Sequence, residues 1–189
     1  LARRRGSVTR REVAEAGFHT HTLSRLVRAG ALERVARGRY RLPDAPITEH
    51  HGLALVAAAV PKAVICLLSA LRFHEIGTQA PHQVWIALAR GAAQPRGTHQ
   101  SIQVMRFSGV AYTEGIEEHQ IVGVQLHVYN PAKTIADCFK YRNKIGLDVA
   151  LEALREALRG RKCTVDDLWK YANTCRVSKV MRPYMEAML

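Results

Sequence analysis

The sequence has few cysteines and no long hydrophobic run, and each scarcity argues against a class of protein. The four cysteines, Cys66, Cys138, Cys163 and Cys175, lie far apart, form no CxxC pair and have no histidines at zinc-ligand spacing. This argues against a disulfide framework or a zinc site and predicts a reduced, cytoplasmic protein. The longest apolar run, residues 52–60, is too short to span a bilayer, and the sequence shows no signal peptide. We therefore expect no membrane partner.

Sequence signatures of catalysis are also missing. There is no glycine-rich phosphate-binding loop, no GxSxG, no HExxH and no deaminase-type zinc signature. The nine histidines are scattered, and the doublet His50–His51 fits a solvated helix start better than a metal site. Asp166–Asp167 fits the acidic first turn of a helix. We therefore expect a protein that is not an enzyme and that has no metal and no cofactor.

Lys133, Thr134 and Asp137 are the best candidates for a catalytic group, since spacings of three and four residues bring side chains together on a helix. The alternative is structural, with Asp137 as the satisfied partner of a backbone or side-chain donor near the strand ends. We favour the structural interpretation. A pocket around Lys133 and Asp137 would instead favour an enzyme, or a modulator of one, acting through the C-terminal half.

Positive charge is abundant and unevenly placed. The 189 residues carry a formal charge of +12, and 48% of them are hydrophobic, which is ample for a packed core. Residues 1–45 hold eleven arginines against four acidic residues, a net +7, so more than half of the excess lies in under a quarter of the chain. Such a field favours a polyanionic partner and adds a salt-dependent term to binding.

Residues 7–42 read as two short helices, a tight turn and a hairpin. Thr9 and Glu12 form a capping box that opens the first helix, which Gly17 ends. Phe18 is expected to anchor the turn from below. A second helix begins near His19 or Thr20 and stops at Gly30, with an apolar face of Leu23, Leu26 and Val27.

Two short strands are expected after these helices, over residues 32–35 and 40–42, with Gly38 in the turn between them. The turn is basic at its tip. Helix, turn, helix and basic hairpin together predict a winged helix-turn-helix that binds DNA. The competing interpretation is a small helical domain whose arginines are a solvated surface.

The expected DNA-contacting residues lie on the polar face of the second helix, at the start of the first and at the hairpin tip. Arginine suits bidentate contact with guanine, and serine and threonine mostly reach phosphate. The start of the second helix also favours phosphate, and the hairpin tip should reach backbone or minor groove. The candidates are Arg10, Arg11, His19, Thr20, His21, Thr22, Ser24, Arg25, Arg28, Arg37 and Arg39.

The prolines around residue 45 predict a boundary between domains 1–45 and 47–189. The second domain is expected to be α+β, with a largely antiparallel sheet. Its strands are predicted over 63–66, 83–89, 101–107, 115–121 and 125–129, although the apolar run through residue 63 could instead continue as helix. Asn130 and Pro131 open the C-terminal helices, which continue over 147–158 and from Thr164. The chain begins at Leu1 rather than methionine, and we expect upstream residues that include most of the first helix of a winged-helix domain.

Two stretches resemble one protein family. TRREVA (residues 9–14), LSRLV (23–27) and RGRY (37–40), with Gly17, Gly30 and Leu32 between them, resemble the N-terminal domain of AbiEi-type antitoxins of type IV toxin–antitoxin systems. VYNPAKTIAD (128–137) resembles the signature that opens the C-terminal helices of the same family. Neither stretch is a catalytic fingerprint.

The resemblance implies a function that the residues alone do not. Antitoxins of this family bind inverted repeats in their own promoter through the winged helix and repress the operon. They counter a nucleotidyltransferase-like toxin through the C-terminal domain, without requiring a stable complex. Residues 1–45 would then read double-stranded DNA, and residues 47–189 would counter the toxin. Some family members are stand-alone regulators.

A third possibility is an RNA-binding or scaffolding module. The basic segment contains only two aromatic residues, Phe18 and Tyr40, and Phe18 is expected to be buried, so a base-stacking platform is lacking. Competition between double-stranded DNA and RNA would discriminate these possibilities.

Overall fold

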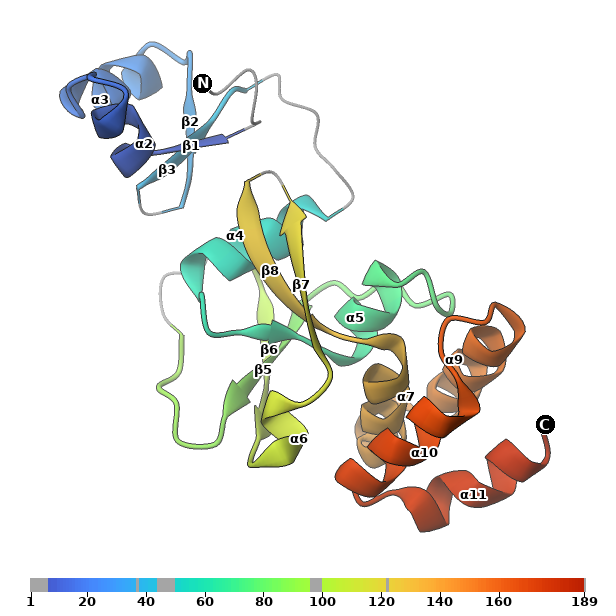
Figure 1. Ribbon diagram of the computed structural model, residues 1–189. Coiled ribbons are helices and arrows are strands. Elements are labelled where there is room, and N and C mark those ends of the chain that lie inside the picture. The colour runs from blue at the N-terminus through green and yellow to red at the C-terminus, as the bar shows by residue number, and fades with distance from the viewer. Residues whose placement is uncertain (1–6, 37, 44–49, 96–99, 122, 189) are drawn as a thin grey trace.

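The computed structural model describes residues 7–36, 38–43, 50–95, 100–121 and 123–188 (Figure 1). The chain forms two separate sheets, one of three strands near the N-terminus and one of five strands after residue 50. We call residues 7–43 the N-terminal unit and residues 50–188 the second unit. The expected boundary, between residues 45 and 47, lies outside the described residues, so the division into domains stays a prediction.

The N-terminal unit packs two helices against a small antiparallel sheet of strand order β1-β3-β2. Its elements are β1 (Ser7–Thr9), α2 (Arg10–Glu15), α3 (His21–Arg28), β2 (Glu33–Ala36) and β3 (Arg39–Arg41). The expected hairpin is present, and β1 adds a third strand by pairing with β3, which the sequence did not predict. The core consists of Val8, Val13, Leu23 and Leu32. Apolar residues spaced along α2 and α3 therefore close the unit around its own core.

The capping box at Thr9 is confirmed. The Thr9 hydroxyl oxygen accepts a hydrogen bond from the Glu12 backbone N–H at 3.2 Å, and the Thr9 N–H donates to Glu12 Oε2 at 2.7 Å. These bonds satisfy amide groups that a helix start otherwise leaves without partners. They fix the first residue of α2 at Arg10.

The second unit is built on a mixed sheet of order β6-β5-β4-β8-β7. The prediction of a largely antiparallel sheet is wrong, because β5–β6 and β4–β8 are parallel while β4–β5 and β7–β8 are antiparallel. The segment between β5 and β6, residues 90–101, is long enough for the crossover connection that two parallel neighbouring strands require. The strands are β4 (Val64–Ile65), β5 (Val84–Ala89), β6 (Ile102–Phe107), β7 (Ile116–Ile121) and β8 (Val124–Tyr129). A strand at residues 64–65 also decides against continuous helix there.

Helices cover both faces of this sheet, as Figure 1 shows. On one face, α4 packs over Ile65, Ile86 and Val128, and on the other α7 and the helices after it pack over Ala87 and Tyr129. The helices are α4 (His51–Ala59), α5 (Leu67–Phe73), α6 (Val110–Thr113), α7 (Pro131–Lys140), α8 (Arg142–Ile145), α9 (Leu147–Arg159), α10 (Val165–Thr174) and α11 (Ser178–Glu186). The fold is therefore mixed α+β with C-terminal helices. Within the described ranges, no helix has the length and apolar character needed to cross a bilayer.

Candidate nucleic-acid interface

The second helix of the N-terminal unit, α3, presents a polar stripe to solvent. His21, Ser24, Arg25 and Arg28 are all exposed and follow the spacing that places residues on one side of a helix. Leu23 on the opposite side is 2% exposed and packs in the core. No acidic residue occurs in α3. The helix therefore offers two guanidinium groups and several uncharged hydrogen-bonding groups on one surface.

The start of α2 lies beside the start of α3. The guanidinium of Arg10 donates a hydrogen bond from Nη2 to the hydroxyl of Thr20 at 3.2 Å. Thr20 is the N-cap residue of α3, yet its side chain caps no backbone N–H group. The Arg10 backbone N–H donates to the carbonyl oxygen of Gly38 at 2.8 Å, in the hairpin turn. Two helix starts and the hairpin turn thus meet around Arg10.

The remaining expected contact residues are placed unequally. His19 is exposed just before α3, and Thr22 is half-buried within it. Arg11 is exposed but already paired, with its Nε 2.6 Å from Glu15 Oε1. Arg37 lies outside the described residues, and of Arg39 only the backbone, in β3, is described. The structure therefore joins Arg10 of α2 to Thr20 at the start of α3, and it describes neither hairpin-tip side chain. Contact of any of these residues with DNA stays a prediction.

Phe18 contradicts the sequence prediction. It was expected under the turn between the two helices, but it is 60% exposed. The helix-ending hydrogen bonds fix its backbone, and Val13 fills the core position instead. The argument against RNA that relied on a buried Phe18 therefore fails. The signal that could have drawn attention to it is its place between Gly17 and His19, directly before the polar face of α3.

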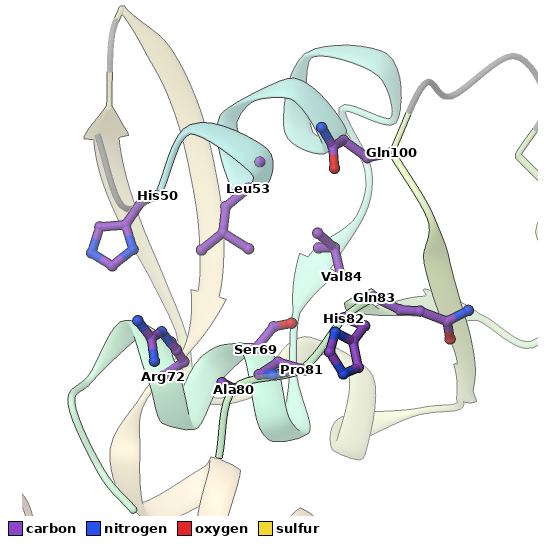
Figure 2. Close-up of a pocket in the computed structure, with 11 residues that line it drawn as sticks. His50, Leu53, Ser69, Arg72, Ala80, Pro81, His82, Gln83, Val84 and Gln100 are labelled. Atoms are coloured by element: carbon purple, nitrogen blue, oxygen red, sulfur yellow. The ribbon is translucent and has the colours of Figure 1, made fainter. Parts of the chain in front are cut away.

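The second unit contains a pocket of about 340 Å³ with a lining of mixed polar and apolar residues (Figure 2). Side chains from α4, α5 and the segment before β5 surround it, with Ser69 and Leu53 among the buried ones. Arg72, His50 and His82 contribute to the wall, and no acidic residue is among the described residues that line it. None of the expected DNA-contacting residues lines this pocket. The pocket is therefore separate from the polar stripe of α3.

The candidate catalytic group lies in the core of the second unit. Lys133, Thr134 and Asp137 are each 0% exposed. Lys133 Nζ lies 2.5 Å from Asp137 Oδ2 and 4.1 Å from the centre of the Tyr129 ring. The Cys175 thiol donates to Asp137 Oδ1 at 3.2 Å. Asp137 is thus the partner of side-chain donors, as the structural interpretation predicts, and in this conformation the group is closed to a substrate.

Burial dominates the electrostatics of this cluster. It raises the pKa of Asp137 above its ordinary value, although the Lys133 ammonium acts in the opposite direction. It also raises the pKa of the Cys175 thiol to about 12. All four cysteines are free thiols. Within the described residues, no three or more His, Cys, Asp or Glu side chains gather as metal ligands would.

The comparisons with known proteins bear on the N-terminal unit first. Residues 1–43 match a family model described as "Transcriptional regulator, AbiEi antitoxin". The N-terminal segment is therefore similar to the AbiEi antitoxin family over these residues. This confirms the resemblance drawn from residues 9–40. The AbiEi match ends at residue 43, so the likeness of residues 128–137 to the same family stays a prediction.

One solved structure is similar over nearly the whole chain. The crystal structure of the RV2827C protein from Mycobacterium tuberculosis covers 92% of this chain and 68% of its own, with a TM-score of 0.63 and 17% sequence identity. At that identity the similarity shows a shared fold. No curated protein matches the chain. The AbiEi match therefore supports a transcriptional regulator or antitoxin. Separately, the fold shared with the RV2827C protein includes the second unit.

Proposed function

We propose that this protein is a DNA-binding autorepressor and antitoxin of a type IV toxin–antitoxin system. The N-terminal unit acts as a winged helix-turn-helix, with α3 as recognition helix and the β2–β3 hairpin as wing. The observation that carries the proposal is the exposed stripe of His21, Ser24, Arg25 and Arg28, which has no acidic neighbour on α3. The AbiEi match over the same residues supports it. Such a repressor acts in the cytoplasm on double-stranded DNA.

The parts of the interface have different roles in this proposal. Arg25 and Arg28 read base edges in the major groove, because guanidinium groups pair bidentately with guanine. His19, Thr20, His21, Thr22 and Ser24 contact phosphate or bases near the helix start, and Arg10 and Arg11 hold phosphate. Arg37 and Arg39 reach the backbone or the minor groove from the wing. Inverted repeats in the promoter would place two copies on one operator.

Gel-shift binding to the DNA upstream of this protein's own gene tests the proposal, with scrambled DNA and RNA as competitors over a salt series. Each of Arg25→Ala and Arg28→Ala should weaken specific binding by about 1–3 kcal/mol and relax specificity. An Arg37→Ala/Arg39→Ala double variant should weaken binding to all sequences and reduce the salt slope by about 0.9 for each phosphate that is no longer neutralised. Arg155→Ala, an exposed arginine on α9, is the matched control and should bind as wild type. Equal affinity for every polyanion would refute specific DNA recognition, and so would the absence of any binding.

The antitoxin role rests on the family likeness and assigns the second unit to countering a nucleotidyltransferase-like toxin. Co-expression of the full chain with the candidate toxin should restore growth. An Arg25→Ala/Arg28→Ala variant should still restore it, because neutralisation does not need operator binding. Specific DNA binding without rescue would indicate a stand-alone regulator.

A further inference from the structure

Phe18 is a large apolar side chain that directly precedes the exposed polar and cationic residues of α3. At 60% exposure it is, with Val110 at 59%, one of two exposed large hydrophobic residues in the described part of the chain. Phe107 and Phe139, by contrast, are buried in the core. An exposed ring forgoes the stabilisation that burial would supply. Exposure therefore limits how much the apolar side chain of Phe18 stabilises the fold.

The backbone holds Phe18 in this position. Its N–H donates to the carbonyl oxygen of Val13 at 3.0 Å, and the Gly17 N–H donates to that of Ala14 at 3.0 Å. Gly17 has a φ of +80°, so these bonds close α2 with the paired pattern of a Schellman motif. A hydrophobic residue at the Phe18 position of this motif commonly covers the helix end. Here the backbone pattern is complete and most of the residue remains exposed.

The neighbours of Phe18 favour nucleic acid over protein as its partner. His19 and His21 follow it and are exposed, and Arg25 lies on the same helix that it precedes. Protein interfaces bury hundreds of square ångströms on each partner around an apolar centre, whereas Phe18 is one ring that is followed in the chain by exposed histidines and arginines. A polyanion complements these neighbours.

Given the proposed function, on which this step rests, the residues at the start of α3 enter the major groove. The apolar group exposed on base edges there is the 5-methyl of thymine. We propose that Phe18 reads thymine in the operator by packing its ring against this methyl group. The arginines of α3 and the hydroxyl groups around Thr20 supply hydrogen bonds, and Phe18 supplies the apolar contact that tells thymine from cytosine.

The test compares operator DNA containing thymine with the same DNA containing uracil, which differs by that methyl group. Wild type should lose about fourfold in affinity for each methyl group that it touches. Phe18→Ala should bind thymine DNA correspondingly more weakly and should lose nothing further on uracil DNA. Phe18→Leu should keep part of the preference, because it keeps an apolar side chain. Val110→Ala, a matched loss of an equally exposed apolar residue in the second unit, should leave both affinities unchanged.

The outcomes separate this inference from the proposed function. If Phe18→Ala binds thymine DNA as wild type does, or loses as much as wild type does on uracil DNA, another residue reads the methyl group and the inference is wrong. If Phe18→Ala changes thermal stability or oligomeric state and leaves the thymine preference intact, Phe18 is covered by protein, which also overturns it. Arg25→Ala, measured in parallel, tests the proposed function itself. If wild type does not bind the operator specifically, both the proposed function and the inference about Phe18 are wrong.

Discussion

Removing either partner of the buried ion pair between Lys133 and Asp137 should destabilise the protein, and removing Lys133 should make the loss depend on pH. In Lys133→Met, the Asp137 carboxylate loses the ammonium 2.5 Å away and must take up a proton or stay charged in the core. In Asp137→Asn, the Lys133 ammonium is left among the Tyr129 and Phe107 rings and must lose its proton or stay charged. Both side chains are 0% exposed, so water does not compensate for the missing partner.

The loss of unfolding free energy in each variant cannot exceed the free energy needed to neutralise the charged side chain that remains. From ordinary side-chain pKa values, neutralising an aspartate at pH 7 costs about 4.2 kcal/mol and a lysine about 4.6 kcal/mol, at 1.36 kcal/mol per pH unit. Each single variant should therefore lose up to about 4–5 kcal/mol of unfolding free energy at pH 7, in line with the roughly 3–5 kcal/mol typical of a broken buried pair. The loss is large enough to measure by urea denaturation.

The sign of the pH dependence follows from which state binds the proton. In Lys133→Met, the folded state takes up a proton on Asp137 that the unfolded state lacks at neutral pH, so the loss should grow by about 1.4 kcal/mol per unit as pH rises. In Asp137→Asn, the Lys133 ammonium stays in the core without a carboxylate beside it, so this variant should also lose stability at pH 7. The Lys133→Met/Asp137→Asn variant should lose less than the sum and depend little on pH. Equal, pH-independent losses that add in the double variant would refute the ion pair.

Three further predictions concern local features of the fold. Gly115→Ala should cost at least about 1–3 kcal/mol in urea unfolding, because Gly115 has a φ of +76° and a Cβ would lie 2.8 Å from that of Lys133, whereas Gly91→Ala, with nothing within 4 Å, should be nearly neutral. Thr9→Ala should cost about 1 kcal/mol and speed amide exchange at the start of α2, and unchanged exchange there would contradict the capping role. Burial lowers the pKa of His74, so its neutral form is favoured in the fold and stability should fall as pH drops through about 6.5. His74→Gln should flatten that fall, and an unchanged pH profile would show that His74 does not cause it.

Features that depend on residues three or four apart could be predicted. Thr9 with Glu12 forms the expected capping box, and Asn130 caps α7 before Pro131 as expected. Thr164, where a helix was predicted to start, forms a second capping box with Asp167. In each case a side-chain oxygen accepts a hydrogen bond from a backbone N–H group a few residues away, so the position of the helix start depends little on the rest of the chain. The polar stripe of α3 is equally local, because helical periodicity alone separates Leu23 from Arg25.

The positions of the strands could also be predicted from the sequence, but their directions could not. Short runs of β-branched residues predicted β5, β6, β7 and β8 close to their observed bounds. The same runs can pair in either direction, and the choice depends on where a connection such as residues 90–101 returns the chain. The parallel pairs β5–β6 and β4–β8 therefore came only from the assembled sheet.

Several features could be read from the amino-acid sequence alone: the basic N-terminal segment, the starts and stops of its helices, the spacing that gives α3 one polar and one apolar face, and a family likeness over residues 1–43. Other features became visible once the chain was folded: β1 pairs with the hairpin, Arg10 donates to Thr20, Phe18 lies outside the core, and Lys133 and Asp137 are fully buried. The physical reason is that burial and side-chain partnership depend on which distant segments arrive beside a residue. Hydrogen bonds across three or four residues are set by the local chain, and the environment of a side chain is set by the whole fold.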